Sequence, residues 1–259
     1  MIISSNADAI QRSLTEQARN FETRSMNFTK QDYLDYTVSC VAPQKTDKVL
    51  DVAAGTCACG RSIAPFVQNV TCLDLTAAML AVGKDAAEKQ GLCNIDLVLG
   101  DAEQMPFLES SFDIVISRLA FHHFPHPERC FAEMIRVLKP GGKLAVIDME
   151  AAEDALRQTE DEIEALRDPS HVKNLSKEEF LEMFVKHHLA VKNTNSTAIP
   201  VSLTAWLALT STPAKVSADI SKHFADEIEG SYLTGFSLYR KNGDIFFDQR
   251  WLMVIGEKV

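Results

Sequence analysis

The chain has 259 residues, of which 46% are hydrophobic and 24% are charged, and its formal net charge is −10 at pH 7. These values fit one large globular domain, or a core with a modest appended part. The acidic balance, with a pI near 5.2, argues against a nucleic-acid backbone or an anionic membrane as the main partner, because both attract basic surfaces.

Targeting and metal signals are absent from the sequence. Residues Met1 to Phe21 lack the apolar segment of a signal peptide, and no apolar run approaches about 18 residues. We therefore expect a cytoplasmic protein without an integral membrane segment. The six cysteines stand singly except for Cys57 and Cys59, and they show neither Cys-x-x-Cys nor zinc-like spacing. We expect buried, reduced thiols and no metal.

The first 45 residues are polar and predict helices. Apolar residues recur there at near-helical spacing, at Ile10, Leu14, Ala18 and Phe21. A second helix is expected over about residues 30–42, where Pro43 ends it. We expect residues 1–45 to form a helical lid over the active site.

Residues 46–150 alternate between short apolar runs and helical patterns. Strands rich in Val, Ile and Leu are expected at 48–53, 70–74, 95–99, 112–118 and 143–149, with helices near 60–68, 76–90 and 127–139. Such strands are typical of a parallel sheet that is buried on both faces. The alternation predicts right-handed crossovers in a doubly wound α/β sheet, which would form the ligand-binding core.

The later part of the chain has a different character. Residues 151–230 are expected to form a helical insertion that covers the substrate, and the acid-rich stretch from Glu150 to Asp168 predicts a helix with a solvated acidic face. Asn242-Gly243 lies between two β-rich runs, which is a strong hairpin signal. Residues 231–259 are therefore expected to form a β-hairpin that completes the sheet.

Three of the expected strands lead into an acid, namely Asp51, Asp74 and Asp101. The first is followed at once by small residues, including Ala53 and Gly55, which leave space for a ligand against the backbone. In open parallel sheets, ligands bind at the carboxyl ends of the strands. Asp74 stands about twenty residues past the loop, like the ribose-binding acid of dinucleotide-binding folds. The three acids predict a cofactor that contains a nucleoside.

Five segments, in this order, resemble class I S-adenosylmethionine-dependent methyltransferases of the type 11 group, which are related to the quinone-biosynthesis C-methyltransferases. The segments are 49–56 (VLDVAAGT), 73–80 (LDLTAAML), 100–107 (GDAEQMPF), 111–115 (SFDIV) and 137–142 (VLKPGG). The resemblance covers roughly residues 15–149 and the closing hairpin. It implies a seven-stranded sheet of order 3-2-1-4-5-7-6 with an antiparallel last strand.

The resemblance implies S-adenosyl-L-methionine as the cofactor and methyl transfer to a small molecule. Asp74 would accept hydrogen bonds from the ribose, Asp101 would accept one from the adenine amino group, and Asp51 would lie near the methionine amino end. The other residues expected at the cofactor are Ala53, Gly55, Leu75, Met79, Ala102 and Arg118. The family's glycine-rich loop is altered here, because Ala53 stands at its first glycine and Cys57 stands at its third, where it could narrow the pocket.

His122 and His123 follow the fourth expected strand and should face the reacting methyl group. An imidazole with a pKa near 6.5 suits proton removal at neutral pH, and His123 is the preferred base. The alternative is that both rings only line the pocket.

Substrate contacts are expected from two other regions. Arg167 and His171 lie at a turn marked by Pro169, although Arg167 could instead pair with Asp168. Phe21 and Phe28 could form an aromatic lid against the sulfonium, or they could pack in the core.

Three alternative functions remain open. A quinone-ring C-methyltransferase is favoured by Ala53 alone. A nicotinamide-dependent oxidoreductase needs Gly-x-Gly-x-x-Gly, whereas this chain has only Gly55 and Gly60 in that region. The third alternative is a methyltransferase-like protein that binds a cofactor or a protein partner without catalysis.

Overall fold

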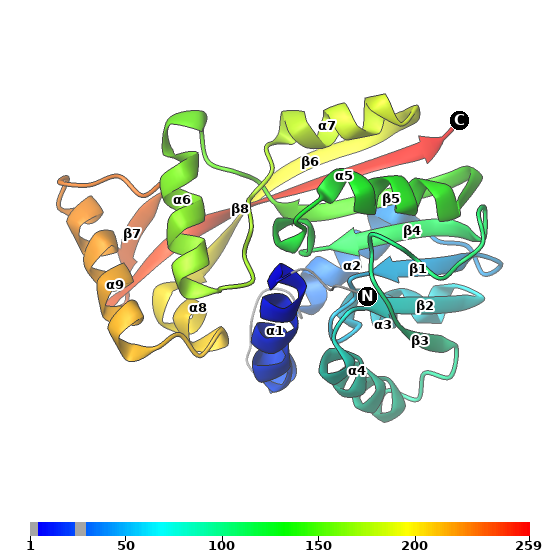
Figure 1. The fold of residues 1–259 in the computed structure, drawn as a ribbon, viewed down its shortest axis with the longest axis horizontal. Coiled ribbons are helices and arrows are strands. Elements are labelled where there is room, and N and C mark those ends of the chain that lie inside the picture. Colours follow the sequence, from blue (N-terminus) through cyan, green and yellow to red (C-terminus); the bar gives the residue numbers. More distant parts are fainter. Residues whose placement is uncertain (1–4, 24–29) are drawn as a thin grey trace.

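The computed structural model describes residues 5–23 and 30–259, which form a three-layer α/β core with an appended part (Figure 1). The strands are β1 (Lys48–Val52), β2 (Asn69–Asp74), β3 (Ile95–Leu99), β4 (Phe112–Arg118), β5 (Leu138–Met149), β6 (Leu189–Ser202), β7 (Leu238–Lys241) and β8 (Asp244–Lys258). The helices are α1 (Ser5–Thr23), α2 (Gln31–Val41), α3 (Ala58–Ile63), α4 (Ala77–Lys89), α5 (Pro127–Val137), α6 (Asp154–Arg167), α7 (Lys177–Lys186), α8 (Leu203–Leu209) and α9 (Ala214–Ile228). Two short 3-10 helices are η2 (Ala64–Phe66) and η3 (Phe121–His123).

The eight-stranded sheet has the order β3-β2-β1-β4-β5-β8-β6, and β7 pairs only with β8. The strands from β1 to β5 pair in parallel, whereas β8 runs antiparallel to both β5 and β6. The fold class is confirmed, and the antiparallel strand lies where it was expected. The sheet has one strand more than the expected seven because β7 is an additional, short strand.

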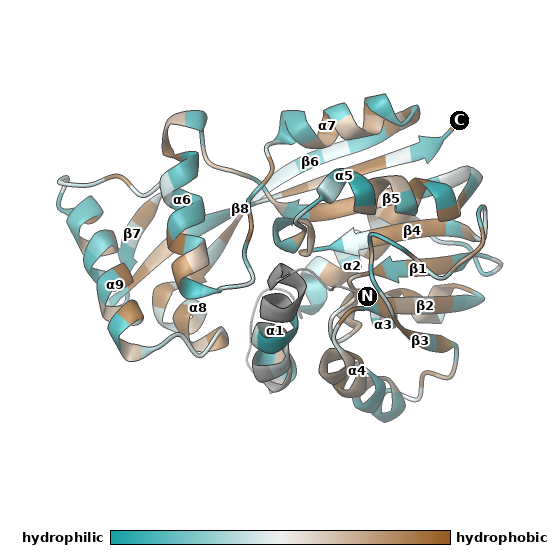
Figure 2. Ribbon diagram, viewed as in Figure 1, coloured by the Kyte–Doolittle hydropathy of each residue, from teal (hydrophilic) through white to brown (hydrophobic). Residues whose placement is uncertain are grey.

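Alternate residues of β1 face the two helical layers. Leu50 belongs to a buried cluster with Phe131 of α5, while Val49 packs in another cluster with Leu34 of α2 and Ile63 of α3. This arrangement explains the nearly continuous apolar strands, which are largely brown in Figure 2. Burial on both faces fixes the carboxyl ends of β1, β2 and β4 at one edge, where ligands bind in open parallel sheets.

A separate hydrophobic cluster holds the appended part together. It surrounds Trp206 of α8 and includes Phe224 of α9, Phe236 and Phe247 of β8, all at most 3% exposed. Trp206, at 2% exposure, is thus a packing residue. In Figure 1 this part lies at the far end of the long strands β6 and β8, beyond α1.

The structure corrects the description of residues 151–230 as a helical insertion. The region contains helices α6 to α9, but it also contains β6, which pairs with β8 from Leu189 to Ser202. The expected hairpin is present, with Asn242 and Gly243 both at positive φ (53° and 80°), as a type I′ turn requires. Its second strand, β8, reaches the core sheet, whereas its first strand does not.

Candidate functional site

The loop after β1 is held in an unusual backbone conformation. Ala53, Gly55 and Cys57 have φ values of 54°, 55° and 60°, a region in which glycine is favoured. A side chain on Gly55 would meet no atom within 4 Å, so the backbone there borders open space. The loop therefore keeps the conformation of a glycine-rich turn although two of the family's glycines are replaced.

The Cys57 side chain packs against α4. Its Sγ atom lies only 2.9 Å from the position of a Cβ atom on Gly83 of α4, and the thiol is fully buried. The Cys57 side chain thus fills the contact between the loop and α4, and its effect on the ligand pocket stays a prediction. Four of the six free cysteines are buried, while Cys40 is half-buried and Cys93 is exposed.

Asp74, at the end of β2, faces this loop. Its oxygens accept hydrogen bonds from the backbone N–H of Gly55 (2.7 Å) and of Thr76 (2.8 Å), and the residue is 5% exposed. Burial raises the pKa of Asp74 above its usual value, and the hydrogen bonds oppose that rise. The carboxylate therefore joins the segment before α4 to the loop after β1.

Asp51 and Arg118 lie deeper, at the centre of the sheet. Asp51 accepts the N–H of Gly60 (2.8 Å), and burial raises its pKa to about 7 although the Gly60 hydrogen bond and Arg118 oppose the change. The Arg118 guanidinium lies over the ring of Trp251, 5.2 Å from its centroid, and is attracted by Asp51 and Asp148. This arrangement gives Arg118 a role in balancing charge near the switch point between β1 and β4.

The other residues expected at the cofactor differ in exposure. Asp101 is exposed, and its Oδ1 accepts the N–H of Glu103 (2.8 Å). Ala102 and Met79 are buried, at 8% and 1% exposure. The Leu75 carbonyl accepts a hydrogen bond from Gln11 of α1 (2.9 Å). Asp74 and Asp101 therefore follow neighbouring parallel strands, and α1 runs beside them.

The segment after β4 is held by Asp148, a residue that sequence reasoning missed. Asp148 Oδ2 accepts the N–H groups of Ala120 (2.9 Å) and Phe121 (2.6 Å), and Oδ1 lies 2.6 Å from His122 Nδ1. Burial opposes charge on His122, but attraction to Asp148 raises its pKa. Asp148 interrupts an apolar strand near its carboxyl end, which is the same signal that identified Asp51 and Asp74.

His123 lies beside His122, with ring centroids 4.1 Å apart, but has different partners. Its Nδ1 lies 3.0 Å from the carbonyl oxygen of Ser170, so Nδ1–H donates and Nε2 keeps its lone pair. Burial and the neighbouring His122 lower the pKa of His123 to about 3. The ring is therefore neutral at pH 7 and is a weak base. It is better suited to orienting a bound molecule by a hydrogen bond than to removing a proton from it.

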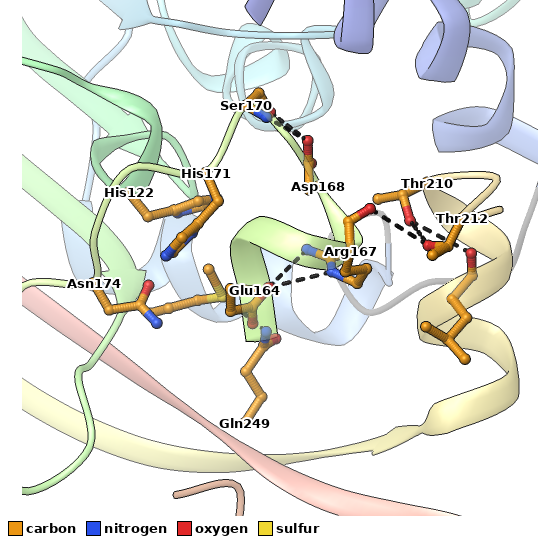
Figure 3. A network of polar contacts seen from close by, with 12 residues as sticks. His122, Glu164, Arg167, Asp168, Ser170, His171, Asn174, Thr210, Thr212 and Gln249 are labelled. Atoms are coloured by element: carbon orange, nitrogen blue, oxygen red, sulfur yellow. Dashed lines mark hydrogen bonds and ion pairs between the residues drawn. The ribbon is translucent and has the colours of Figure 1, made fainter. Parts of the chain in front are cut away.

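Arg167 and His171 come from α6 and from the turn that follows it (Figure 3). Arg167 contacts Glu164 (3.0 Å) and lies over the ring of Trp206, 4.4 Å from its centroid. Its ion pair is therefore with Glu164, and Arg167 also helps to lower the pKa of Asp168. His171 Nε2 lies 2.9 Å from Asp161, and its ring stacks on that of His122 at 5.9 Å.

The N-terminal helix connects the two parts of the molecule. Ser13 donates to Asp168 (3.0 Å) after α6, and Asn20 donates to the carbonyl of Leu209 (2.9 Å) at the end of α8. Phe21 is half-buried near the end of the same helix, while Phe28 lies outside the described residues. The helix thus borders the loop edge of the sheet and the appended part together.

The acidic run on α6 is only partly the solvated face that the sequence predicts, because Glu162 is exposed whereas two other glutamates are buried. Glu160 and Glu164 are 5% and 1% exposed, and Glu160 is paired with Arg250 of β8. Burial raises the pKa of Glu160 to about 7, although Arg250 opposes the shift. Helical periodicity gave no signal for this burial, because acids occur on both sides of α6.

Two negative findings concern the described part of the chain. Across residues 5–23 and 30–259, every helix is too short or too polar to cross a lipid bilayer. Within the same ranges, no three His, Cys, Asp or Glu side chains are grouped so that they could hold a metal ion.

Known proteins resemble this chain in both sequence and fold. Residues 50–146 match the model of a methyltransferase domain. The "Uncharacterized methyltransferase YcgJ" of Bacillus subtilis is 31% identical over 226 residues, which span 86% of this chain and 87% of that protein. The crystal structure of a putative methyltransferase from Bacillus halodurans superposes with a TM-score of 0.80 at 30% identity, covering 87% and 98% of the two chains.

A quinone-modifying relative matches a smaller part of the chain. The demethylmenaquinone methyltransferase of Renibacterium salmoninarum is 40% identical over 114 residues, which are 43% of this chain and 45% of that protein. The match therefore covers less than half of either protein.

Proposed function

The chain belongs to the type 11 methyltransferase family, and we propose that this methyltransferase uses S-adenosyl-L-methionine to methylate a small molecule. The observation that carries the proposal is the contact between Asp74 and the N–H of Gly55, which joins the end of β2 to the loop after β1. In nucleoside-binding α/β folds, an acid at this position hydrogen-bonds the ribose, and the small-residue loop lets the ligand approach the backbone closely.

The residues present fit such a cofactor. Gly55 borders open space on the side where a side chain would project, so a ligand can approach the backbone closely. Asp74 would hold the ribose, exposed Asp101 and buried Ala102 would meet the adenine, and Leu75 and Met79 would form its apolar walls. Asp51, Ala53 and Arg118 complete the proposed cofactor site near the centre of the sheet.

The cofactor, when bound, supplies a methyl group on a positively charged sulfur. The chain's own task is then to align the acceptor with that group, since proximity and orientation can contribute about 7–11 kcal/mol. We propose that His122, fixed by Asp148, shapes the loop after β4. His123 would accept a hydrogen bond from the methyl acceptor through Nε2, which would orient the attacking atom.

We also propose that residues 1–45 and 151–230 recognise the acceptor, with Phe21, Phe28, Arg167 and His171 as contacts. The bonds from α1 to Asp168 and Leu209 support this view, because they bring the helix against the appended part. The accepting atom would be oxygen, nitrogen, sulfur or a ring carbon.

A calorimetric titration tests this function. S-adenosylmethionine and its demethylated product should both bind, and NADH should not bind. Binding of NADH without binding of the sulfonium cofactor would overturn the proposal. A thermal-shift screen of metabolites in the presence of the demethylated product would then identify acceptors.

The second candidate function is quinone-ring methylation, which the 40% identity to the demethylmenaquinone methyltransferase favours over the matched core. An assay with a demethylated quinone and labelled cofactor distinguishes it. Labelled quinone would support this candidate, whereas label in other metabolites alone would exclude it.

A further inference from the structure

An acid-lined cavity lies between α6, the segment after β5 and the middle of β8. Four carboxyl groups line it, those of Glu150, Glu160, Glu164 and Asp248, together with the rings of Phe236 and Phe247. Its interior has only about 10 Å³ of room for the centre of a water-sized group. This is about the space that one such group needs, so the cavity can take a single small head group, such as an ammonium, and not a complete ligand.

The charges around this cavity are not balanced. Arg250 is paired with Glu160, and Arg167 contacts Glu164 at 3.0 Å. Within residues 5–23 and 30–259, neither Glu150 nor Asp248 is in an ion pair. The carboxylates therefore outnumber the guanidinium groups that accompany them, which favours entry of a further positive charge.

A buried amide oxygen also lacks a donor there. Asn174 lines the cavity, is 2% exposed, and its Oδ1 receives no hydrogen bond from any residue that the structure describes. Figure 3 shows its side chain pointing toward those of Glu164 and Gln249. Buried acceptors are normally satisfied, so this oxygen calls for a ligand that donates an N–H or O–H group.

We propose that this cavity binds a protonated amino group of the methyl acceptor, so that the acceptor is a small organic amine. The carboxylates supply the attraction, and the Asn174 oxygen accepts an N–H. A metal ion fits less well, since no group of three suitable ligands is arranged to hold one within the described residues. The inference rests on the proposed function.

The cavity adjoins the proposed active site. Met149 lines it and directly follows Asp148, which fixes His122. His122, His171 and Asn174 also lie near one another in Figure 3. An ammonium group bound beside Glu164 would therefore anchor the acceptor at one end and leave the rest of the molecule free to reach the loop after β4.

Binding of three four-carbon probes tests the inference, namely n-butylammonium, butan-1-ol and butyrate. Titrations followed by ligand-observed NMR, with the demethylated cofactor present, should show n-butylammonium binding at least about tenfold more tightly than butan-1-ol, and butyrate not binding. Glu164→Gln and Asn174→Leu should each weaken n-butylammonium binding at least about fivefold. Glu162→Gln, an exposed acid on the same helix, should leave it unchanged.

If Glu164→Gln fails to fold, Asn174→Leu still tests the inference, because it removes a hydrogen-bond acceptor without breaking an ion pair. Equal binding of the alcohol and the ammonium, no binding of any probe, or an unchanged affinity in Asn174→Leu would overturn the inference. Binding of the demethylated cofactor is measured on the same samples. Its loss would refute the proposed function, whereas its presence without ammonium binding would refute only the cavity's role.

Discussion

Buried carboxylates are the side chains on which this account depends most. Asp51, Asp74, Asp148 and Glu164 are all at most 5% exposed, and each is bonded to backbone N–H groups or to a charged partner. Burying a charge without such partners is costly, so each of these acids is held in a defined position. Their positions define the loop after β1, the segment after β4 and the cavity under α6.

Replacing Asp148 by Asn tests the role of its charge. The amide can still accept the N–H groups of Ala120 and Phe121, but it no longer attracts the charged His122 ring. The pKa of His122 should therefore fall below about 6.5, and the free energy of unfolding near pH 6 should drop by about 3 kcal/mol. An NMR titration of the histidines and urea unfolding measure both quantities.

Glu103→Gln is the matched control, because it removes the carboxylate beside His126, whose side chain is 52% exposed. Its effect on the unfolding free energy should stay within about 0.5 kcal/mol. An unchanged His122 pKa in Asp148→Asn would contradict the ion pair seen here.

The sequence allowed some of these acids to be predicted but not others. Asp51 and Asp74 end apolar strands before small residues or a helix start, and the structure places both at the expected sheet edge. Asp148 also lies near the end of an apolar strand, so the same pattern identifies it. Glu160 and Glu164 could not be recognised, because an acid-rich helix does not reveal which of its acids faces a partner from a distant strand.

Among the elements, α4 is packed unusually closely against the loop after β1. A Cβ on Gly83 would lie 2.8 Å from the carbonyl oxygen of Thr56 and 2.9 Å from Cys57 Sγ. A real Cβ needs more room than this, so any side chain there must push the helix away from the loop.

Gly83→Ala should therefore destabilise the protein by about 1–3 kcal/mol and weaken binding of the demethylated cofactor. Helix propensity alone predicts the opposite sign, a gain of about 1 kcal/mol for Gly→Ala. Thermal melts measure the change in stability, and calorimetry measures the change in cofactor affinity. Ala81→Gly, at an exposed position of the same helix, should cost about 1 kcal/mol without affecting cofactor affinity, and a stabilised Gly83→Ala would contradict the packing.

The strands of the core were predictable, whereas β6 was not. Strands β1 to β5 are short apolar runs between helical patterns, and their bounds agree with the expected ranges except at the start of β5. β6 is an edge strand with several polar, exposed residues and with Pro200 near its end. An edge strand pairs on one side only and tolerates proline. Neither an alternation of apolar and polar residues nor the composition therefore identifies β6 as a strand.

At the scale of the whole molecule, the shifted pKa values predict how stability varies with pH. Below pH 7 the folded protein keeps protons on Asp51 and Glu160, whose pKa values are about 7, while the unfolded chain releases them above about pH 4. His123, with a pKa of about 3, acts in the opposite direction, since the unfolded chain protonates it below about pH 6.5. The raised pKa values of Asp74 and His122 add to the effect of the first two.

The folded state thus binds at least one proton more than the unfolded state between about pH 4 and pH 7, so the unfolding free energy should fall as the pH rises. The slope should be about 1.4 kcal/mol per pH unit for each extra proton. Urea unfolding at a series of pH values measures it. Glu160→Gln should flatten the slope by about one proton and the exposed Glu162→Gln should not, while stability that rises toward pH 7 would contradict the assignment.

The central claim is that acids at the ends of neighbouring strands hold one adenosyl cofactor, and calorimetric titration with S-adenosylhomocysteine tests it most directly. Asp74→Ala and Asp101→Ala should each bind at least about tenfold more weakly than the unchanged protein, with cooperative thermal melts. Asp96→Ala, an exposed acid near the opposite end of β3, should bind normally. Full affinity in both Asp74→Ala and Asp101→Ala would contradict the claim.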